Sequence, residues 1–405
     1  MSVNTLRLLD KYPGLILCWI FTFCRFISYL LHKKKSLPSP KKILIIKLSE
    51  MGSTIFVYPA VSELKKKIPN SEIFFLVFEH NREILDEMNI TSGSNIFTVN
   101  VDNPTKLFIS IIQLFFKLRK ISIDTTIDMD FFSRLSASLA FIVCRGNRIG
   151  FHKFTNEGLS RGKLLTHPVM YSPHIHTSIA FLSLSKSLFE KSNDFYYKGV
   201  IEDNYIELFD YKPSDTYINS VKSKLLKSGV KLNNKLIIIN PNSSDIFPLR
   251  KWPLNSFAEL CKQIINKRSD IYLILTGTKS ERADAIEIIK QVQDDRCINF
   301  MGMTSLKELL ALYSISELMI TNDSGPAHFS SLLQLPTIVL FGPETPTLYK
   351  PLNKECRCLY SNFTCSPCVS VYNGKKSPCK DNLCLKAISV KTVLDETMKI
   401  IETRP

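Results

Sequence analysis

The chain has 405 residues, of which 45% are hydrophobic and 22% charged. This composition excludes a disordered chain, and the length predicts two or three folded domains. The formal net charge of +15 would suit a nucleic-acid partner, but residues 1–42 hold eight basic residues against one acidic residue, Asp10. Much of the excess therefore flanks one apolar segment, which indicates attraction to an anionic membrane surface. No nucleic-acid motif is present, so we expect no nucleic acid among the partners.

The apolar segment is 12–31, and lysines follow it at 33–35. Its length suits a membrane span, but Arg25 interrupts it, and a central charge is costly in hydrocarbon. Either the helix spans with Arg25 reaching the interface, or it lies in the interface plane. A buried N-terminal helix is the alternative. The three lysines favour a cytoplasmic body, and the segment 36–40 lacks the cleavage site of a signal peptide.

After the 36–40 linker, apolar runs alternate with amphipathic runs, which predicts strands and helices in turn. In the first half we predict strands at 42–48, 72–78, 96–99, 123–129 and 148–151, and helices at 54–68, after His80, and at 105–120, 133–143 and 177–189. The segment 151–175 is loop-like, and the polar segment 191–215 is typical of an inter-domain connection.

The alternation then restarts in the second half of the chain. Here we predict strands at 236–240, 271–276, 298–301, 318–321 and 337–341, and helices at 257–266, 281–292, 306–314, 327–333 and 391–402. Unpatterned apolar strands between helices are typical of parallel sheets covered on both faces. We therefore predict an α/β chain of two doubly wound domains, 41–215 and 216–390. Residues 1–40 precede them, and a helix in 391–405 could cross back to the first domain.

Ligands of open parallel sheets bind beyond the carboxyl ends of the strands. In the second domain four loops at those ends are small and rich in hydroxyl groups, which suits a phosphate-bearing ligand. The candidate residues on these loops are Asn242, Ser243, Gly277, Asp323, Ser324, Gly325 and His328. Pro326 follows Gly325 at a helix start, where free backbone amides attract an anion, although an ordinary helix cap has the same pattern.

Two cations, Arg250 and Lys251, follow the first of these loops and precede Trp252. Together they can neutralise a diphosphate, which favours the ligand interpretation of the neighbouring loops. A solvated pair beside a buried tryptophan is the alternative.

Several motifs resemble those of glycosyltransferase family 9, the heptosyltransferases and relatives of bacterial lipopolysaccharide assembly. The resemblance rests on 322–328 (NDSGPAH) with 341–343 (FGP), on 250–253 (RKWP), on 43–53 with 58–60 (YPA), and on Asp130, Arg134 and 148–151 (RIGF). It covers about 41 to 395, and the combination is specific although each motif is short.

The resemblance implies a GT-B architecture, with an acceptor domain and a nucleotide-sugar domain facing a cleft. It implies inversion at the anomeric carbon without a metal or other cofactor. The donor would be a nucleotide sugar such as ADP-heptose, and the acceptor lipopolysaccharide or another lipid-linked glycan at the cytoplasmic face of the bacterial inner membrane. By position, Arg250 with the amides of Ser324 and Gly325 would hold the diphosphate, and Asp323 would contact the sugar. Glu281 would reach the nucleoside.

One departure concerns the catalytic base, because the family has Gly-Asp in the first loop and this chain has Gly52-Ser53. A serine hydroxyl is not a base at neutral pH without a partner. Glu50 is the only carboxylate on this loop, so we predict Glu50 as the base, beside Ser53. A base from elsewhere is an alternative. A second alternative is a chain that has lost catalysis and only binds glycan or partner proteins. A third is a nucleotide-sugar epimerase, which would not need the apolar segment.

Two further clusters resemble metal sites. Asp128 and Asp130 form an Asp-x-Asp motif, but in the wrong half for the donor, so we expect a structural or acceptor-facing role. Four thiols, Cys365, Cys368, Cys379 and Cys384, have spacing that can hold zinc; reduced thiols or a loop staple are the favoured alternative. The family carries a similar insert. Cys356 and Cys358 have no interpretation.

Overall fold

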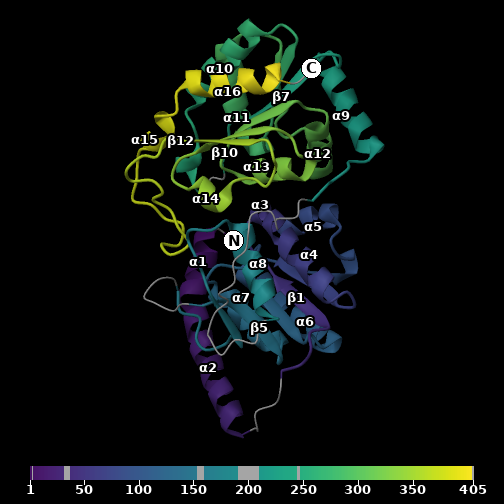
Figure 1. Ribbon diagram of the computed structural model, residues 1–405, viewed down its shortest axis with the longest axis vertical. Helices are drawn as coiled ribbons and strands as arrows, with labels where there is room; N and C mark the ends of the chain where they lie inside the picture. Colours follow the sequence, from purple (N-terminus) through teal and green to yellow (C-terminus); the bar gives the residue numbers. More distant parts are fainter. Residues whose placement is uncertain (2, 32–36, 153–158, 190–208, 244–246, 404–405) are drawn as a thin grey trace. The chain divides into compact units, whose positions relative to one another are not determined.

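The computed structural model of the protein describes residues 1, 3–31, 37–152, 159–189, 209–243 and 247–403. The chain divides into two units, Met1–Glu207 with Val371–Gly374, and Leu208–Ser370 with Lys375–Pro405. Each unit contains one six-stranded sheet (Figure 1). The lysines at 33–35, Ser244 and most of the predicted connection 191–215 lie outside the described residues.

The first unit is built on a sheet in which every pairing is parallel. Its strands are β1 (Lys42–Ile46), β2 (Glu72–Phe78), β3 (Ile96–Val99), β4 (Thr125–Asp128), β5 (Asn147–His152) and β6 (His167–Met170). Residues 43–46 are fully buried, as expected for a strand covered on both faces. The order is β3-β2-β1-β4-β5-β6, so the direction of winding reverses between β1 and β4. Such a switch point is where ligands bind in these sheets.

Helices cover both faces of the first sheet. They are α1 (Val3–Lys11), α2 (Pro13–Leu31), α3 (Met51–Thr54), α4 (Tyr58–Lys67), α5 (Arg82–Met88), α6 (Pro104–Ile121), α7 (Arg134–Val143) and α8 (Thr177–Ser187), with 3-10 turns η1 (Ile55–Val57), η2 (Glu79–Asn81) and η3 (Gly93–Asn95). Residues of α6 and α7 share one core with β1 and β2, and Leu6 and Leu9 of α1 pack against it. Helix α4 packs against α8.

The second unit repeats this topology. Its strands are β7 (Lys235–Asn240), β8 (Ile271–Leu275), β9 (Cys297–Asn299), β10 (Leu318–Asn322), β11 (Thr337–Phe341) and β12 (Cys356–Tyr360). All pairings are parallel, and the order is β12-β11-β10-β7-β8-β9. Numbered from β7, this is the order of the first sheet, with the switch point between β7 and β10.

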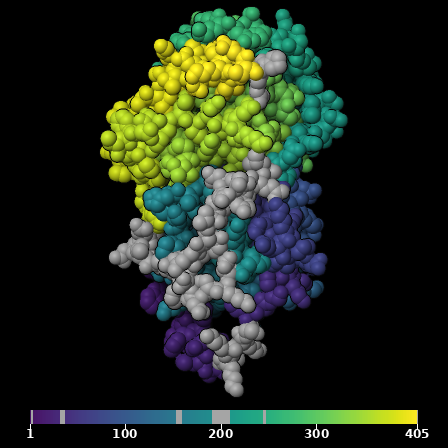
Figure 2. Space-filling model, in the orientation of Figure 1, coloured from purple at the N-terminus to yellow at the C-terminus, as the bar shows by residue number. Residues whose placement is uncertain are grey.

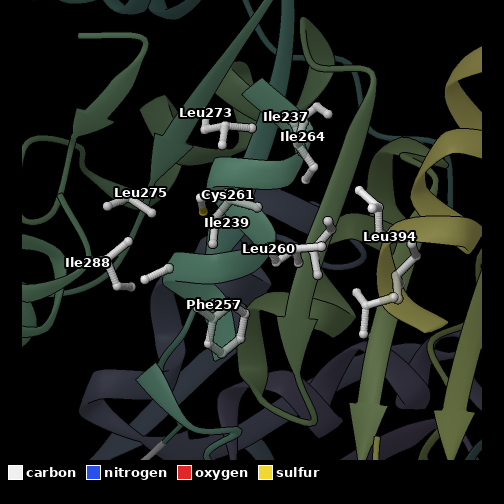
Figure 3. Close-up of a cluster of buried hydrophobic side chains, with 14 of the residues drawn as sticks. Ile237, Ile239, Phe257, Leu260, Cys261, Ile264, Leu273, Leu275, Ile288 and Leu394 are labelled. Atoms are coloured by element: carbon white, nitrogen blue, oxygen red, sulfur yellow. The ribbon is translucent and has the colours of Figure 1, made fainter. Parts of the chain in front are cut away.

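The helices of the second unit are α9 (Asp215–Lys227), α10 (Leu254–Lys267), α11 (Arg282–Val292), α12 (Leu306–Ser314), α13 (Gly325–Phe329), α14 (Pro346–Tyr349), α15 (Leu383–Lys386) and α16 (Val390–Glu402), with turns η5 (Pro248–Arg250), η6 (Lys279–Glu281) and η7 (Ser330–Leu333). One apolar core joins α10, α11, α15 and α16 to the sheet. Figure 3 shows Phe257, Leu260 and Ile264 of α10 in this core, with Ile237 of β7 and Leu394 of α16. Helix α16, in yellow, lies on the surface of this unit (Figure 2).

The predicted α/β class with two parallel sheets is confirmed, but the structure differs from the local predictions in several places. The segment 151–175 contains β6, an edge strand whose Pro168 interrupts the strand pattern. Helix α9 and edge strand β12 were not predicted. The helix predicted at 54–68 is α3, η1 and α4 in succession. Helix α16 packs in the core of the second unit.

The N-terminal segment Asn4–Leu31 is long and apolar enough, by length and composition, to cross a bilayer. Its most apolar window has a mean hydropathy of 1.9, and 11% of that window is buried. So small a buried share contradicts the alternative of a buried N-terminal helix.

Candidate functional site

The polar residues at the switch point of the second sheet follow four adjacent strands, β11, β10, β7 and β8. Asn240 ends β7, and Asn242 and Ser243 follow it; Asp323 and Ser324 follow β10. All five are buried. The structure therefore brings the predicted residues of two separate loops to one edge of the sheet.

Asn322, the last residue of β10, holds this edge together and was not among the predicted site residues. Its Nδ2 donates to the carbonyl of Pro241 at 2.7 Å, and its Oδ1 accepts from the backbone N–H of Trp252 at 2.9 Å. The Trp252 ring is buried and its Nε1 donates to the carbonyl of Ile388 at 3.1 Å. Asn322 thus joins the loop after β7 to the segment that carries Arg250 and Lys251.

The two predicted cations each lie near a carboxylate. The guanidinium Nη1 of Arg250 is 3.6 Å from Oδ2 of Asp323, and Nζ of Lys251 is 3.7 Å from Oδ2 of Asp284. Asn382 donates to the carbonyls flanking Arg250, at 3.1 Å to Leu249 and 2.7 Å to Lys251. The backbone at Arg250 is therefore fixed from two sides, whereas its long, partly exposed ion pair is weak enough to accept a new partner.

Three buried polar atoms at this edge have no hydrogen-bond partner among the described residues. They are Oδ1 of Asn240, Oδ1 of Asn242 and Nε of Arg250. Each unsatisfied buried group costs about 1–3 kcal/mol. Such a cost is unusual in a native protein, and acceptors and a donor gathered at one sheet edge match the needs of a polar ligand.

Gly277 follows β8 and lies close to the same loop. A Cβ at this position would be 2.7 Å from Nδ2 of Asn242 and 3.0 Å from Oε2 of Glu281, so glycine permits the close approach. Oε2 of Glu281 accepts from the backbone N–H and the hydroxyl of Thr278, at 2.7 and 2.8 Å, in a capping box. Glu281 thus caps its own helix start, and its predicted contact with a nucleoside stays a prediction.

The turn after β10 forms a helix start, as predicted, with Pro326 in the first turn of α13. Ser324 is the N-cap residue, but its side chain does not cap; its Oγ lies 3.4 Å from the hydroxyl of Thr321. His328 is buried in the same short helix. The predicted residues Asp323, Ser324, Gly325 and His328 are therefore neighbours at the switch point.

In the first unit, Glu50 lies on the loop that leaves β1 at the switch point. Its φ is 64°, in the left-handed region, which costs a non-glycine residue about 1 kcal/mol. Its side chain is exposed, whereas Ser53 is buried. The Ser53 hydroxyl donates to the Glu50 carbonyl at 3.0 Å and lies 3.3 Å from Oε2. The two predicted catalytic residues are therefore in contact, and backbone strain of this kind is often found at functional sites.

Asp130 holds this loop in place from the end of β4. Its Oδ2 accepts from the backbone N–H of Leu48 at 2.8 Å, and its Oδ1 accepts from the hydroxyl of Ser49 at 3.1 Å. Nζ of Lys47, also buried, is 3.6 Å from Oδ1 and donates to the carbonyl of Ser49. This carboxylate is thus used in positioning the residues just before Glu50.

Asp128 is fully buried and also has protein donors. Its Oδ2 lies 2.5 Å from Nη1 of Arg161 and accepts from the hydroxyl of Ser136 at 2.8 Å. Burial raises the pKa of Asp128 to about 6, an effect that the Arg161 charge partly offsets. The two carboxylates of the Asp-x-Asp motif therefore have structural partners.

The four cysteines Cys365, Cys368, Cys379 and Cys384 lie on the loop after β12 and in α15. Among the residues that the structure describes, no three His, Cys, Asp or Glu side chains are placed to hold a metal ion. The loop instead packs at the end of β11, where the N–H groups of Cys368 and Val369 donate to the carbonyl of Pro343. Cys356 and Cys358 lie in β12.

The comparison with known families matches residues 111–377 to the model of glycosyltransferase family 9, described as heptosyltransferase. This match covers more than half of the chain. The chain belongs to glycosyltransferase family 9. The resemblance drawn from the motifs is thereby confirmed.

Relatives within family 9 are distant but numerous. The chain is 28% identical over 179 residues to lipooligosaccharide heptosyltransferase 2 of Campylobacter jejuni, covering 44% of this chain and 53% of that protein. It is 24% identical over 320 residues to the lipopolysaccharide core heptosyltransferase OpsX of Haemophilus influenzae, covering 78% and 83%. The chain thus spans about half the length of the first of these relatives.

A solved structure shares the fold. The structure of E. coli ADP-heptose lipopolysaccharide heptosyltransferase II superposes with a TM-score of 0.66 at 19% identity, covering 89% of this chain and 99% of that one. The two-sheet GT-B fold predicted from the motifs is therefore confirmed.

Proposed function

We propose that this chain transfers heptose from ADP-heptose to the core of lipopolysaccharide, with inversion and without a metal ion, at the cytoplasmic face of the bacterial inner membrane. The observation that carries the proposal is the set of unsatisfied polar atoms beside Arg250 at the switch point of the second sheet, in a family 9 chain. The name of the E. coli neighbour supports ADP-heptose as the donor.

In this proposal the second unit holds the donor. Arg250 exchanges its long contact with Asp323 for the diphosphate, and Lys251 adds a second positive charge beside it. The carboxylate of Asp323 is then available to sugar hydroxyls. The amide oxygens of Asn240 and Asn242 gain donors from the ligand, which removes the cost of leaving them unsatisfied.

Glu50 of the first unit is the proposed general base. Its carboxylate removes the proton of the acceptor hydroxyl while that oxygen attacks the anomeric carbon. The bond from this carbon to the ADP oxygen breaks, and ADP leaves with the electron pair. Ser53 donates its hydrogen bond to the Glu50 loop and so orients the carboxylate, a role that a hydroxyl can fill where it cannot act as the base.

Donor binding is tested by calorimetric titration of the full chain with ADP-heptose and with UDP-, GDP- and CMP-linked sugars. We expect a response to ADP-heptose that Arg250→Ala weakens about 10- to 100-fold, because a charge-assisted hydrogen bond is worth about 1.5–3 kcal/mol. Arg357→Ala, which removes an exposed arginine of β12, is the matched control and leaves the affinity unchanged. Equal affinity in the two variants, or no binding of ADP-heptose, would refute the donor site.

The base is tested by transfer kinetics on heptose-deficient lipopolysaccharide. Glu50→Gln is expected to lower kcat about 10²- to 10⁴-fold without changing the Kd for ADP-heptose. Glu83→Gln on α5, another exposed carboxylate of the first unit, serves as control. Full activity in Glu50→Gln would exclude Glu50 as the base. A wild-type chain that binds the donor but transfers nothing would favour the lapsed, binding-only alternative.

A further inference from the structure

Helix α2 is attached to the first unit along one side. Its residues Gly14, Cys18, Thr22 and Arg25 recur at helical spacing on that side. A Cβ on Gly14 would lie 2.9 Å from Cβ of Arg134, and Cys18 is 1% exposed. The ring of Phe21 stacks on Phe141 of α7 at 5.3 Å. The helix is therefore packed closely on α7, as Figure 1 also shows.

Polar contacts fix both ends of this attachment. Oδ1 of Asp10 accepts from the backbone N–H of Leu135 at 2.8 Å and from the hydroxyl of Ser133 at 2.9 Å, at the N-terminus of α7. Fifteen residues later, Arg25 donates to the carbonyls of Lys163 and Leu165, the latter at 2.8 Å. The charge that interrupts the apolar segment is thus satisfied by protein carbonyls.

These contacts are incompatible with a helix that crosses a bilayer. The stretch from Asp10 to Arg25 is about 22 Å long as a helix, and both ends contact the same unit. A span needs about 30 Å of helix inside hydrocarbon, which would pull the docked side away from α7 and leave Arg25 without its carbonyls.

The opposite side of α2 is apolar and exposed. Five of its exposed large side chains are Ile16, Trp19, Phe23, Phe26 and Leu30, with between 57% and 71% of their surface accessible. At 3.6 residues per turn, their mean direction is about 125° around the helix from that of the docked residues. One side of the helix thus packs on the first unit, and the stripe of exposed residues named above is apolar.

Helix α6 has a second exposed apolar stripe. Phe108, Ile109, Ile112 and Phe116 are 65%, 48%, 41% and 66% exposed, while Leu107, Leu114 and Leu118 fill the core. The exposed basic residues Lys117, Arg119 and Lys120 follow at its C-terminal end. Helices α6 and α7 cover the same side of the first sheet, and α2 packs outside α7. The two helices that carry the apolar stripes are therefore both neighbours of α7 in the first unit.

We propose that α2 and α6 together form one bilayer-binding surface, with α2 lying in the plane of an anionic membrane rather than crossing it. The apolar stripes enter the boundary between headgroups and acyl chains, and the basic residues contact anionic headgroups. Exposed Trp19 fits this depth, since tryptophan favours the interface. The surface does not depend on donor binding and would bring a lipid-linked acceptor to the first unit.

The test is flotation of the full chain with vesicles of phosphatidylethanolamine and phosphatidylglycerol. We expect Phe108→Ser with Phe116→Ser to weaken binding about tenfold or more. Leu226→Ser with Ile286→Ser, which removes two similarly exposed side chains of α9 and α11 in the second unit, is the matched control and binds as wild type. Unchanged binding of the α6 variant would overturn the proposal.

Two further measurements distinguish the in-plane helix from a helix that crosses the bilayer and from a dimer interface. A protease site placed before Met1 stays open to protease added outside the vesicles if α2 lies in the plane, and protection of that site would show that α2 crosses. Sedimentation without vesicles detects whether two copies of the chain form a dimer. If the α6 variant loses a dimer but binds vesicles as wild type does, the stripe serves self-association and the membrane surface is refuted. ADP-heptose affinity in the α6 variant should equal that of wild type, which keeps this test apart from the donor site.

Discussion

The two units share one strand order but use the polar residues at their switch points differently. In the first unit, the carboxylates of Asp128 and Asp130 accept hydrogen bonds from donor groups of the protein itself. In the second, the amide oxygens of Asn240 and Asn242 have no donor among the described residues. The first switch point is thus stabilised internally and presents the exposed carboxylate of Glu50. The second retains hydrogen-bonding capacity for a ligand.

This difference is energetic as well as geometric. Buried charges in the first unit are costly unless paired, so each pair must be complete in the absence of any ligand. Neutral amides can remain unsatisfied for a cost of about 1–3 kcal/mol each, which ligand binding returns. Substitutions at the first switch point should therefore change stability, and those at the second should change affinity.

The largest expected effect is that of Asp128→Asn. It leaves the guanidinium of Arg161, whose side chain is 1% exposed, buried without its counter-charge. Breaking a buried pair in this way costs about 3–5 kcal/mol. We expect this loss in the free energy of unfolding, measured by chemical denaturation, with ADP-heptose affinity of the folded fraction unchanged.

The control for this prediction is Asp86→Asn, which removes the exposed partner of Arg82 on α5. Exposed pairs of this kind contribute about 0.2–1 kcal/mol. If Asp128→Asn were no more destabilising than Asp86→Asn, the first switch point would not be a structural ionic site and the contrast between the units would disappear.

The sequence allowed the second switch point to be predicted better than its internal supports. Continuous apolar strands predicted the parallel sheets, and the loops after strand ends predicted that Asn242 and Asp323 lie at one edge, because chain order determines which loops meet. Asn322 and Asn382 were missed since their role depends on contacts between segments distant in sequence, such as Asn382 with the carbonyl of Lys251. Single polar residues of this kind have no distinguishing pattern.

The edges of both sheets were also hard to predict. β6 and β12 are edge strands of four and five residues that lack the continuous apolar run of a central strand. The placement of α2 was open for a different reason: Arg25 had no visible partner in the sequence, and its carbonyl acceptors lie near 140 residues away.

A smaller effect is expected from Gly277→Ala, which addresses the second switch point alone. The added Cβ would lie 2.7 Å from Nδ2 of Asn242 and must displace that side chain. The atoms it meets are side-chain ends, so we expect a stability loss of about 1 kcal/mol and about a tenfold weaker affinity for ADP-heptose. Gly93→Ala in the first unit, where the nearest atom is 3.6 Å away, is the control. An unchanged affinity would show that Asn242 does not contact the donor.

A pH-dependent effect on stability concerns a charge of the second unit away from its switch point. Burial raises the pKa of Glu308, but hydrogen bonds from Lys224, the Ser305 backbone and Ser220 outweigh it and lower the pKa to about 2. The unfolded pKa is about 4.3, so this stabilisation is present above pH 4.3 and lost as the pH falls toward 2. Because Lys224 is partly exposed, we expect about 1–2 kcal/mol rather than the full value of the shift.

Glu308→Gln should therefore unfold more easily than wild type at pH 7, and the difference should shrink steadily as the pH is lowered from 4.3 toward 2. Denaturant titrations at several pH values measure it, and Glu396→Gln on α16, whose partner Lys399 is largely exposed, supplies the comparison. A difference that persists unchanged at the lowest pH would mean that Glu308 acts through packing and not through its charge. Since α9 and α12 lie outside the loops that follow β7 and β10, ADP-heptose affinity should not change in this variant. A changed affinity would mean that charge pairs in the second unit also support the ligand site. The residues that stabilise the protein and those that bind the ligand would then be less separate than the two switch points indicate.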